Sequence, residues 1–221
     1  MFLASLISWL IIYALGTRLE ATRVQQGRWI ARGKNRSTIA LAATLVYTTI
    51  MIVAGVPILL LDFNVGSTNN EMQNLILSFS LGWFIVDTIW AVFEKFWKID
   101  LFMQHLVCSA GLGWVLYTQR NGWEMLGAAG AGEIFPCLYL GLLAKRLKFG
   151  SERFFFVNDS IFVLSFIVIR YCFFSVLAYL VVGADETHPV LATLALLLLL
   201  INYYWGVRLV RKYLDKWGHK L

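Results

Sequence analysis

Two ionisable side chains stand out because the sequence around them is apolar. Asp87 lies in "SLGWFIVDTIW", residues 80–90, and His105 lies in "MQHLV", residues 103–107. A carboxylate that orients an imidazole allows the histidine to act as a general base or to carry an acyl group. The two residue types therefore predict proton transfer or acyl transfer, provided that the fold brings them together.

Three more ionisable residues lie in similarly apolar surroundings, namely Glu133, Asp159 and Arg170. Such residues are costly inside a membrane and usually face a helix-bundle interior, a partner or a water-filled cavity. The opposite charges of Glu133 and Arg170 predict a structural ion pair, with a substrate clamp as the alternative. Glu124 and Arg153 are set apart, because near a span end their side chains can reach the lipid headgroups.

The composition indicates that these residues belong to a membrane protein. Of the 221 residues, 59% are hydrophobic and only 14% are charged, and the mean hydropathy is +0.70. Soluble domains have about 25% charged residues. A membrane span needs about 20 mostly apolar residues. Seven candidate spans meet this requirement and predict an all-α, polytopic fold: 2–16, 38–61, 73–93, 99–118, 122–144, 154–182 and 188–207.

The basic residues alternate between the connections that join these spans. Seventeen Lys and Arg residues fall on one side of the membrane, one falls on the other, and Arg170 lies within a span. Cytosolic loops are enriched in Lys and Arg, so we expect an outer or lumenal N-terminus and a cytosolic C-terminus. The net charge of +6 therefore reflects topology rather than nucleic-acid binding. Basic cytosolic loops also favour anionic lipid headgroups as partners.

The topology assigns similar depths to the candidate residues. Asp87 precedes the cytosolic end of its span by six residues and His105 follows the start of the next by six, which places both ~9 Å inside the boundary. Asp159 reaches a similar level in a later span. We therefore expect one chamber, open to the cytosol, in which these side chains share a layer. Residues at intervals of three and four give Asp87 a polar and aromatic helix face: Ser80, Trp83, Asp87, Trp90 and Glu94.

Several motifs occur in an order that resembles a known family. "SLGWFIVD" at 80–87 resembles the Ser-x-Gly-Tyr/Trp-Phe-Ile-x-Asp segment of the TLC-domain family, which includes ceramide synthases and translocating-chain-associated membrane proteins. "MQHLV" at 103–107 falls where many members carry a His-His pair. "GEIFP" at 132–136, "FIVIRY" at 166–171 and "LINYYWGVRLVR" at 200–211 are similar to segments of the later helices.

The resemblance implies a division of the chain into three parts. A six-helix TLC bundle or barrel would occupy residues 38–215, preceded by an N-terminal helix and basic connection at 1–37 and followed by a basic cytosolic tail at 216–221. In ceramide synthases such a bundle houses the histidine pair and accepts an acyl chain from acyl-CoA on the cytosolic side. The family also implies the endoplasmic reticulum as the location.

The histidine motif of this chain differs from that of the synthases. His105 matches the second histidine of the pair, while Gln104 replaces the first. The downstream acidic pair of the synthases is reduced to Glu133, whereas Asp87 keeps its match. Gln104 cannot titrate, which excludes a relay between two histidines. The chain therefore resembles the non-synthase branch, whose members are associated with membrane-lipid composition, trafficking or sensing.

These observations predict a lipid-handling membrane protein that binds acyl chains or phospholipids in the chamber and acts in lipid homeostasis. In a catalytic version, acyl-CoA would be a substrate, with His105 as base or acyl acceptor and Asp87 orienting it. No cofactor or metal is predicted, since one intramembrane histidine is too few ligands. The predicted substrate-binding residues are Ser80, Trp83, Gln104, Glu133, Asp159, Arg170 and Asn202.

Two alternatives remain open at this point. Asp87 and His105 can serve only as interhelical hydrogen-bonding groups, worth on the order of 1 kcal/mol. The chain can also be an accessory subunit that holds a structural lipid while its outer faces bind a larger membrane complex. Nine Trp and sixteen Phe residues supply contact area for such a complex, although aromatic residues also belt ordinary membrane proteins.

Overall fold

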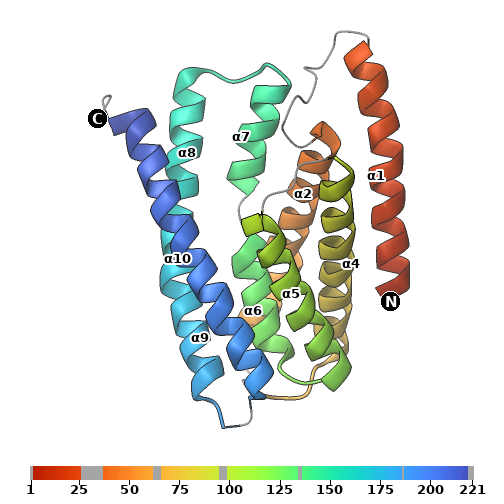
Figure 1. Ribbon diagram of the computed structural model, residues 1–221, viewed down its shortest axis with the longest axis vertical. Helices are drawn as coiled ribbons and strands as arrows, with labels where there is room; N and C mark the ends of the chain where they lie inside the picture. The colour runs from red at the N-terminus through yellow and green to blue at the C-terminus, as the bar shows by residue number, and fades with distance from the viewer. Residues whose placement is uncertain are drawn as a thin grey trace.

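The computed structural model describes residues 2–25, 37–61, 66–94, 99–133, 136–185 and 187–218, with the side chains of 22–25, 100 and 131–133 left out (Figure 1). These ranges are almost entirely helical, and their only β-type pairing is an isolated bridge between Thr68 and Arg120. The predicted all-α class is therefore confirmed.

The first half of the chain forms five α-helices and one π-helical segment. They are α1 (Phe2–Gln25), α2 (Thr38–Ile50), η1 (Met51–Gly55), α3 (Val56–Leu61), α4 (Glu71–Phe93) and α5 (Ile99–Thr118). The second half forms α6 (Gly122–Glu133), α7 (Pro136–Arg146), α8 (Glu152–Phe166), η2 (Ile167–Phe173), α9 (Phe174–Gly183) and α10 (Pro189–Trp217). The π-helical segments η1 and η2 join their neighbouring α-helices without a break.

Local sequence signals explain where several of these helices begin. The side chain of Ser37 accepts a hydrogen bond from the amide of Ala40 at the start of α2. Asn70 and Gln73 form a reciprocal capping box at the start of α4. Ser151 caps α8 in the same way as Ser37 caps α2. These side chains satisfy amides that have no partner within the first turn of a helix.

The helices occupy the positions of the predicted spans. Among the described residues, five helical stretches are long and apolar enough to cross a membrane: 2–21, 38–61, 71–93, 152–183 and 189–217. Neither α5 nor the pair α6 and α7 is among them. The chain is thus an all-helical protein with several membrane-spanning segments, and the total of seven spans stays a prediction.

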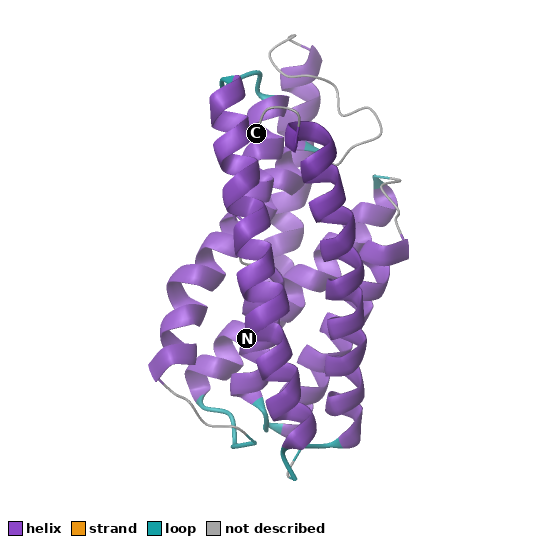
Figure 2. Cartoon of the chain, turned by 90° about the vertical axis from the view of Figure 1, so that its left-hand side faces the viewer, coloured by secondary structure: helices purple, strands orange, loops and turns teal. Residues whose placement is uncertain are grey.

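The helices pack side by side along a common axis (Figure 2). α1 packs mainly against α4, which in turn contacts α5 and α6, while α10 contacts α5, α8 and α9. α7 and α8 form one end of the bundle, and α6 and α9 lie toward the other (Figure 1). Aromatic and aliphatic side chains fill the centre, including Tyr47, Trp83, Phe84, Leu112 and Leu126.

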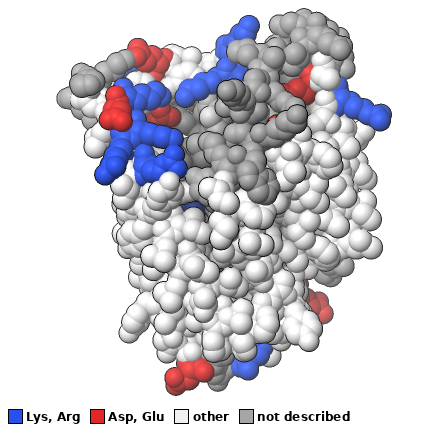
Figure 3. All heavy atoms as spheres, viewed as in Figure 1, with Lys and Arg blue, Asp and Glu red and all other residues white. Residues whose placement is uncertain are grey.

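The outer surface has the charge distribution of a membrane protein. Figure 3 shows a broad uncharged belt between two charged ends, with Lys and Arg gathered at the end where α7, α8 and α10 meet. Large apolar side chains are exposed on many helices, among them Leu3, Leu61, Leu164 and Val176. Apolar exposure on this scale requires contact with lipid rather than water. The chain is therefore an integral membrane protein.

Two buried carboxylates fix the start of α2 from neighbouring helices. Glu20 of α1 accepts hydrogen bonds from the amide of Thr38 at 2.9 Å and from its hydroxyl at 3.1 Å. Glu94, just after α4, accepts from the amide of Ser37 at 3.0 Å. Arg146 of α7 lies 3.7 Å from the Glu20 carboxylate. The N-terminus of a helix carries a partial positive charge, which explains why carboxylates gather there.

Replacing Glu94 with alanine should lower the free energy of unfolding by about 1 kcal/mol, the usual effect of removing a helix cap. The Ser37 amide would lose a charged acceptor in a buried position. Denaturant-induced unfolding in detergent micelles measures the change. Asp215→Ala, which removes an exposed carboxylate from α10, is the matched control and should change stability by less than about 0.5 kcal/mol. Equal effects of the two substitutions would contradict the capping role of Glu94.

Candidate functional site

Asp87 of α4 and His105 of α5 meet in the interior of the protein. The imidazole Nε2 lies 3.7 Å from the carboxylate Oδ2. The other carboxylate oxygen, Oδ1, accepts a hydrogen bond of 2.5 Å from the hydroxyl of Tyr13 in α1. Asp87 is 0% exposed and His105 is 3% exposed. The consecutive helices α4 and α5 and the distant helix α1 therefore contribute to one buried polar group, called here the Asp87/His105 pair.

Aromatic rings enclose this pair. The His105 ring lies 5.8 Å from that of Trp83 and 5.2 Å from that of Phe84, measured between centroids. Tyr47 stacks on Trp83 at 4.0 Å, with the two rings nearly parallel. The pair is thus buried among aromatic rings, at the position where the sequence led us to expect an open chamber. The depths inferred for Asp87 and His105 give no information on how tightly their neighbours pack.

Hydrogen-bond geometry indicates that Nδ1 of the His105 imidazole carries a hydrogen. The Thr88 hydroxyl lies 2.7 Å from the carbonyl oxygen of Phe84 and 2.9 Å from Nδ1 of His105. Its single proton is donated to the carbonyl, because two oxygens at that distance need a proton between them. Nδ1 of His105 must then donate to the Thr88 oxygen. This assignment follows from the hydrogen-bond pattern.

The assignment leaves Nε2 of His105 facing the Asp87 carboxyl group. Nε2 lies 3.7 Å from Oδ2, a distance at which a protonated imidazole forms an ion pair with a carboxylate. The arrangement places a carboxyl group and an imidazole next to each other in the protein interior.

Among the other predicted residues, Ser80 and Gln104 lie on the two helices of the pair, and Arg170 and Asn202 form a second cluster. Ser80 is buried and donates to the sulfur of Met51 at 3.2 Å. Gln104, next to His105 on α5, is also buried. Arg170 of η2 donates to Oδ1 of Asn202 in α10 at 2.7 Å, which joins two of the residues predicted to bind substrate.

The second cluster differs in part from the sequence expectation. Arg170 lies over the rings of Phe166 and Trp205, at 5.3 Å and 5.9 Å from their centroids. The predicted ion pair with Glu133 involves a side chain outside the described residues, although the Glu133 backbone ends α6. Asn202 is the partner that the structure provides for Arg170.

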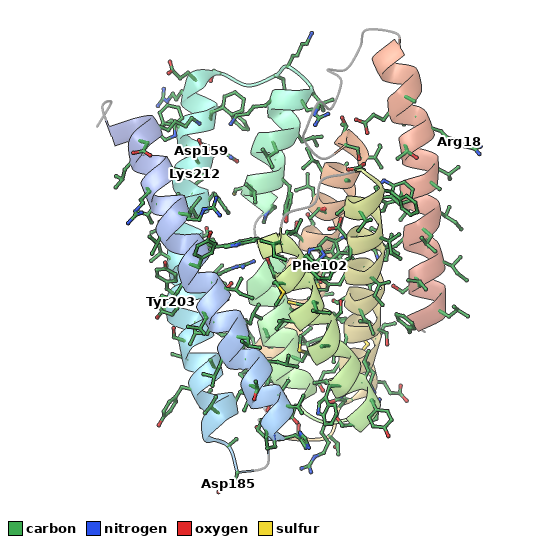
Figure 4. All side chains as sticks on the ribbon, viewed as in Figure 1. Arg18, Phe102, Asp159, Asp185, Tyr203 and Lys212 are labelled. Carbon is green, nitrogen blue, oxygen red and sulfur yellow. The ribbon has the colours of Figure 1, made fainter. Side chains whose placement is uncertain are left out.

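Asp159 does not join Asp87 and His105 in one layer. Its carboxylate pairs with Lys216 and accepts from the indole nitrogen of Trp217 at 3.1 Å, both on α10. Figure 4 shows Asp159 and Lys212 near one end of the bundle, with Asp185 at the other. Counting residues along the span predicted how deep Asp159 lies in the membrane, but not which helices surround it. α8, which carries Asp159, packs against α7 and α10.

Glu124 is also placed differently from the expectation at the headgroups. It is 1% exposed, and its Oε1 accepts from the amide of Gly66 at 2.6 Å and from the Asn121 side chain at 3.0 Å. Its Oε2 has no hydrogen-bond partner in the described part of the chain. It lines a cavity of about 30 Å³ whose other walls are almost entirely apolar, including Cys108 and Phe174. That volume suits about two water molecules.

A larger hollow lies between α7, α8 and α10, toward the basic end of the bundle. Its volume is about 280 Å³. Its walls are Leu138, Phe162, Phe166, Trp205, Arg208, Leu209 and Lys212. Five apolar or aromatic side chains and two cations make this α7/α8/α10 cleft amphipathic. Neither Asp87 nor His105 lines it or the cavity beside Glu124.

Sequence reasoning missed Tyr13 and Thr88, which hold the two sides of the Asp87/His105 pair. A signal for Tyr13 exists in the first helix. Its buried residues recur at intervals of three and four and form one stripe: Trp9, Tyr13, Gly16 and Glu20. Such spacing is typical of a helix with one packed face. This stripe predicts that α1 packs on the bundle rather than standing apart in the lipid.

The fold and the site define an all-helical integral membrane protein with a buried carboxylate and imidazole on neighbouring helices. Within the described ranges, no group of three or more His, Cys, Asp or Glu side chains is placed to hold a metal ion. The family model of the TLC domain matches residues 40–211, and the chain belongs to the TLC-domain family. Neither a curated protein nor a solved structure matched the chain.

Proposed function

We propose that this TLC-domain protein binds membrane lipids by their acyl chains and acts in membrane-lipid homeostasis. The α7/α8/α10 cleft carries the proposal. Its volume of about 280 Å³ is close to the lower end of ordinary small-ligand pockets, about 300 Å³. The rings of Phe162 and Phe166 and the side chains of Leu138 and Leu209 offer an apolar surface to a chain.

The closed environment of the Asp87/His105 pair favours binding over acyl transfer. A histidine that acts as a base or acyl acceptor must reach the reacting atom, within about 3 Å. The 3% exposure of His105 and its aromatic neighbours leave no approach for an acyl-CoA thioester in this conformation. In our proposal the pair instead positions α1, α4 and α5 relative to one another.

The charge distribution supports the orientation that we propose in the membrane. The basic end formed by α7, α8 and α10 would face the cytosol (Figure 3). The connection that contains Asp185, at the opposite end (Figure 4), would face the lumen. The endoplasmic reticulum is the proposed location. The cleft would then open near the cytosolic leaflet, where anionic lipids attract basic residues.

Filling the cleft tests the proposal. Leu138→Trp adds bulk to a cleft wall and should reduce the lipid retained after purification in mild detergent about tenfold, equivalent to about 1.4 kcal/mol of binding free energy. Native mass spectrometry measures the retained lipid. Leu142→Trp is the matched control, because Leu142 lies one turn further along α7 and is exposed. It should retain the lipid of the unaltered protein.

Two outcomes would contradict lipid handling in the cleft. The first is an absence of bound lipid in the unaltered protein, and the second is an equal loss in both tryptophan variants. Comigration of the lipid-free protein with a large membrane complex in mild detergent would favour the accessory-subunit alternative.

A further inference from the structure

One face of α10 places aromatic and cationic side chains along the α7/α8/α10 cleft. Trp205, Arg208, Leu209 and Lys212 all line the cleft, and their spacings of three and four residues bring them onto one helix face. Lys212 lies ~10 Å further along the helix axis than Trp205. The cleft therefore changes from aromatic to cationic toward the basic end of the bundle.

Two cations, Arg208 and Lys212, line the end of the cleft that lies toward the basic end of the bundle. Arg208 donates to the hydroxyl of Tyr204 at 3.0 Å. The carboxylate of Asp159 is paired with Lys216. Within the part of the chain that the structure describes, the residues that line the cleft include two cations and no acidic side chain. A ligand group with negative charge therefore suits this end of the cleft better than an ammonium group.

The aromatic part of the cleft offers a hydrogen-bond donor. The indole nitrogen of Trp205 is buried and has no acceptor among the described residues. Its close neighbour Arg170 lies over the ring at 5.9 Å and can only donate. A buried donor without an acceptor is destabilising, so an acceptor atom on a ligand would improve this position.

We propose that the cleft selects glycerophospholipids whose headgroup carries a net negative charge. The phosphate would bind Arg208 and Lys212, an ester carbonyl would accept from Trp205, and the acyl chain would lie against Phe162 and Phe166. Trp205 and Arg208 are ~4.5 Å apart along the helix axis, a separation that one glycerol unit can bridge. This inference rests on the proposed function and specifies its ligand.

Competition between two headgroups tests the selectivity. The purified protein is incubated with equal amounts of phosphatidylglycerol and phosphatidylcholine that have the same acyl chains, and native mass spectrometry gives the ratio of bound lipids. We expect the unaltered protein to prefer phosphatidylglycerol about tenfold. The double variant Arg208→Gln, Lys212→Gln removes the phosphate contacts of both lipids, so it should bind less lipid in total and bind the two lipids with a ratio near one.

A control with the same loss of charge separates the cleft from the basic surface. Arg211→Gln with Lys148→Gln removes two exposed cations of the same end that do not line the cleft. This control should keep the preference for phosphatidylglycerol. Loss of the preference in the control would overturn the inference, because general surface charge would then explain it. An equal ratio in the unaltered protein would also overturn it.

A conservative change at Trp205 tests the proposed hydrogen bond. Trp205→Phe keeps an aromatic ring and removes the N–H group. It should weaken binding of the ester-linked phosphatidylglycerol about fivefold and leave binding of the ether-linked analogue, which has no carbonyl, unchanged. Equal weakening for both lipids would show that only packing was lost and would overturn the assignment of Trp205.

The results also separate this inference from the proposed function. Lipid that is bound in the cleft and lost in Leu138→Trp, but without headgroup preference, contradicts the selectivity alone. A protein that binds neither phosphatidylglycerol nor phosphatidylcholine contradicts both.

Discussion

Replacing Asp87 with leucine should lower the free energy of unfolding by about 3 kcal/mol, the scale expected when one member of a buried charged pair is removed. The hydroxyl of Tyr13 would lose its acceptor at 2.5 Å, and Nε2 of His105 would lose the carboxylate at 3.7 Å. Both groups are buried, so neither would gain a water molecule in exchange. Unfolding of the purified protein in mixed micelles measures the loss.

A double-mutant cycle gives the control for this prediction. Tyr13→Phe removes only the donor, and Asp87→Leu removes the acceptor. If the hydrogen bond between them stabilises the protein, the double variant should lose less than the sum of the single losses. Strict additivity, or an Asp87→Leu variant as stable as the unaltered protein, would contradict the role of the pair in holding α1 to α4.

A second large loss is expected where α10 crosses η2. An added Cβ at Gly206 would lie 2.0 Å from the hydroxyl oxygen of Tyr171 and 2.4 Å from its Cζ. The ring cannot move away cheaply, since it stacks on Tyr203 with centroids 4.6 Å apart and donates to the Tyr203 carbonyl. Gly206→Ala should therefore cost about 1–3 kcal/mol, as overpacking does elsewhere. Thermal unfolding in detergent measures it.

Gly113→Ala is the matched control for Gly206→Ala. Gly113 lies within α5, and an added Cβ there would meet no heavy atom within 4 Å. Gly113→Ala should therefore be neutral or stabilise by about 0.5–1 kcal/mol, because alanine loses less backbone entropy in a helix. Removing the obstructing ring with Tyr171→Ala should relieve much of the cost of Gly206→Ala. A Gly206→Ala variant as stable as Gly113→Ala would contradict the close packing of Tyr171.

The positions of the helices could be predicted because hydropathy and charge report directly on burial in a bilayer. The predicted spans at 38–61 and 73–93 are helical, and the helix of the second begins at Glu71. Boundaries differ where polar residues extend a helix beyond the apolar stretch. α10 continues to Trp217 rather than ending near 207, since the basic residues after Val207 are good helix formers.

The meeting of Asp87 and His105 was predicted from their depths, whereas their surroundings were not. Depth follows from counting residues along a helix, but lateral position depends on which helices pack together. Asp159 shows this, because its partners come from α10. The π-helical segments η1 and η2 had no signal in hydropathy or in helix propensity. The cleft beside α10 could not be predicted either, because its walls come from three helices whose contacts the sequence does not specify.

The hydrogen bond from Tyr13 has a consequence for how this protein can be divided. The residues that match the family begin at position 40, whereas the phenol that completes the buried site lies 27 positions earlier. A fragment trimmed to the matched region would leave a carboxylate oxygen facing lipid where α1 had covered it. The smallest fragment that can form the complete site must therefore include α1, and it is longer than the region that matches the family model.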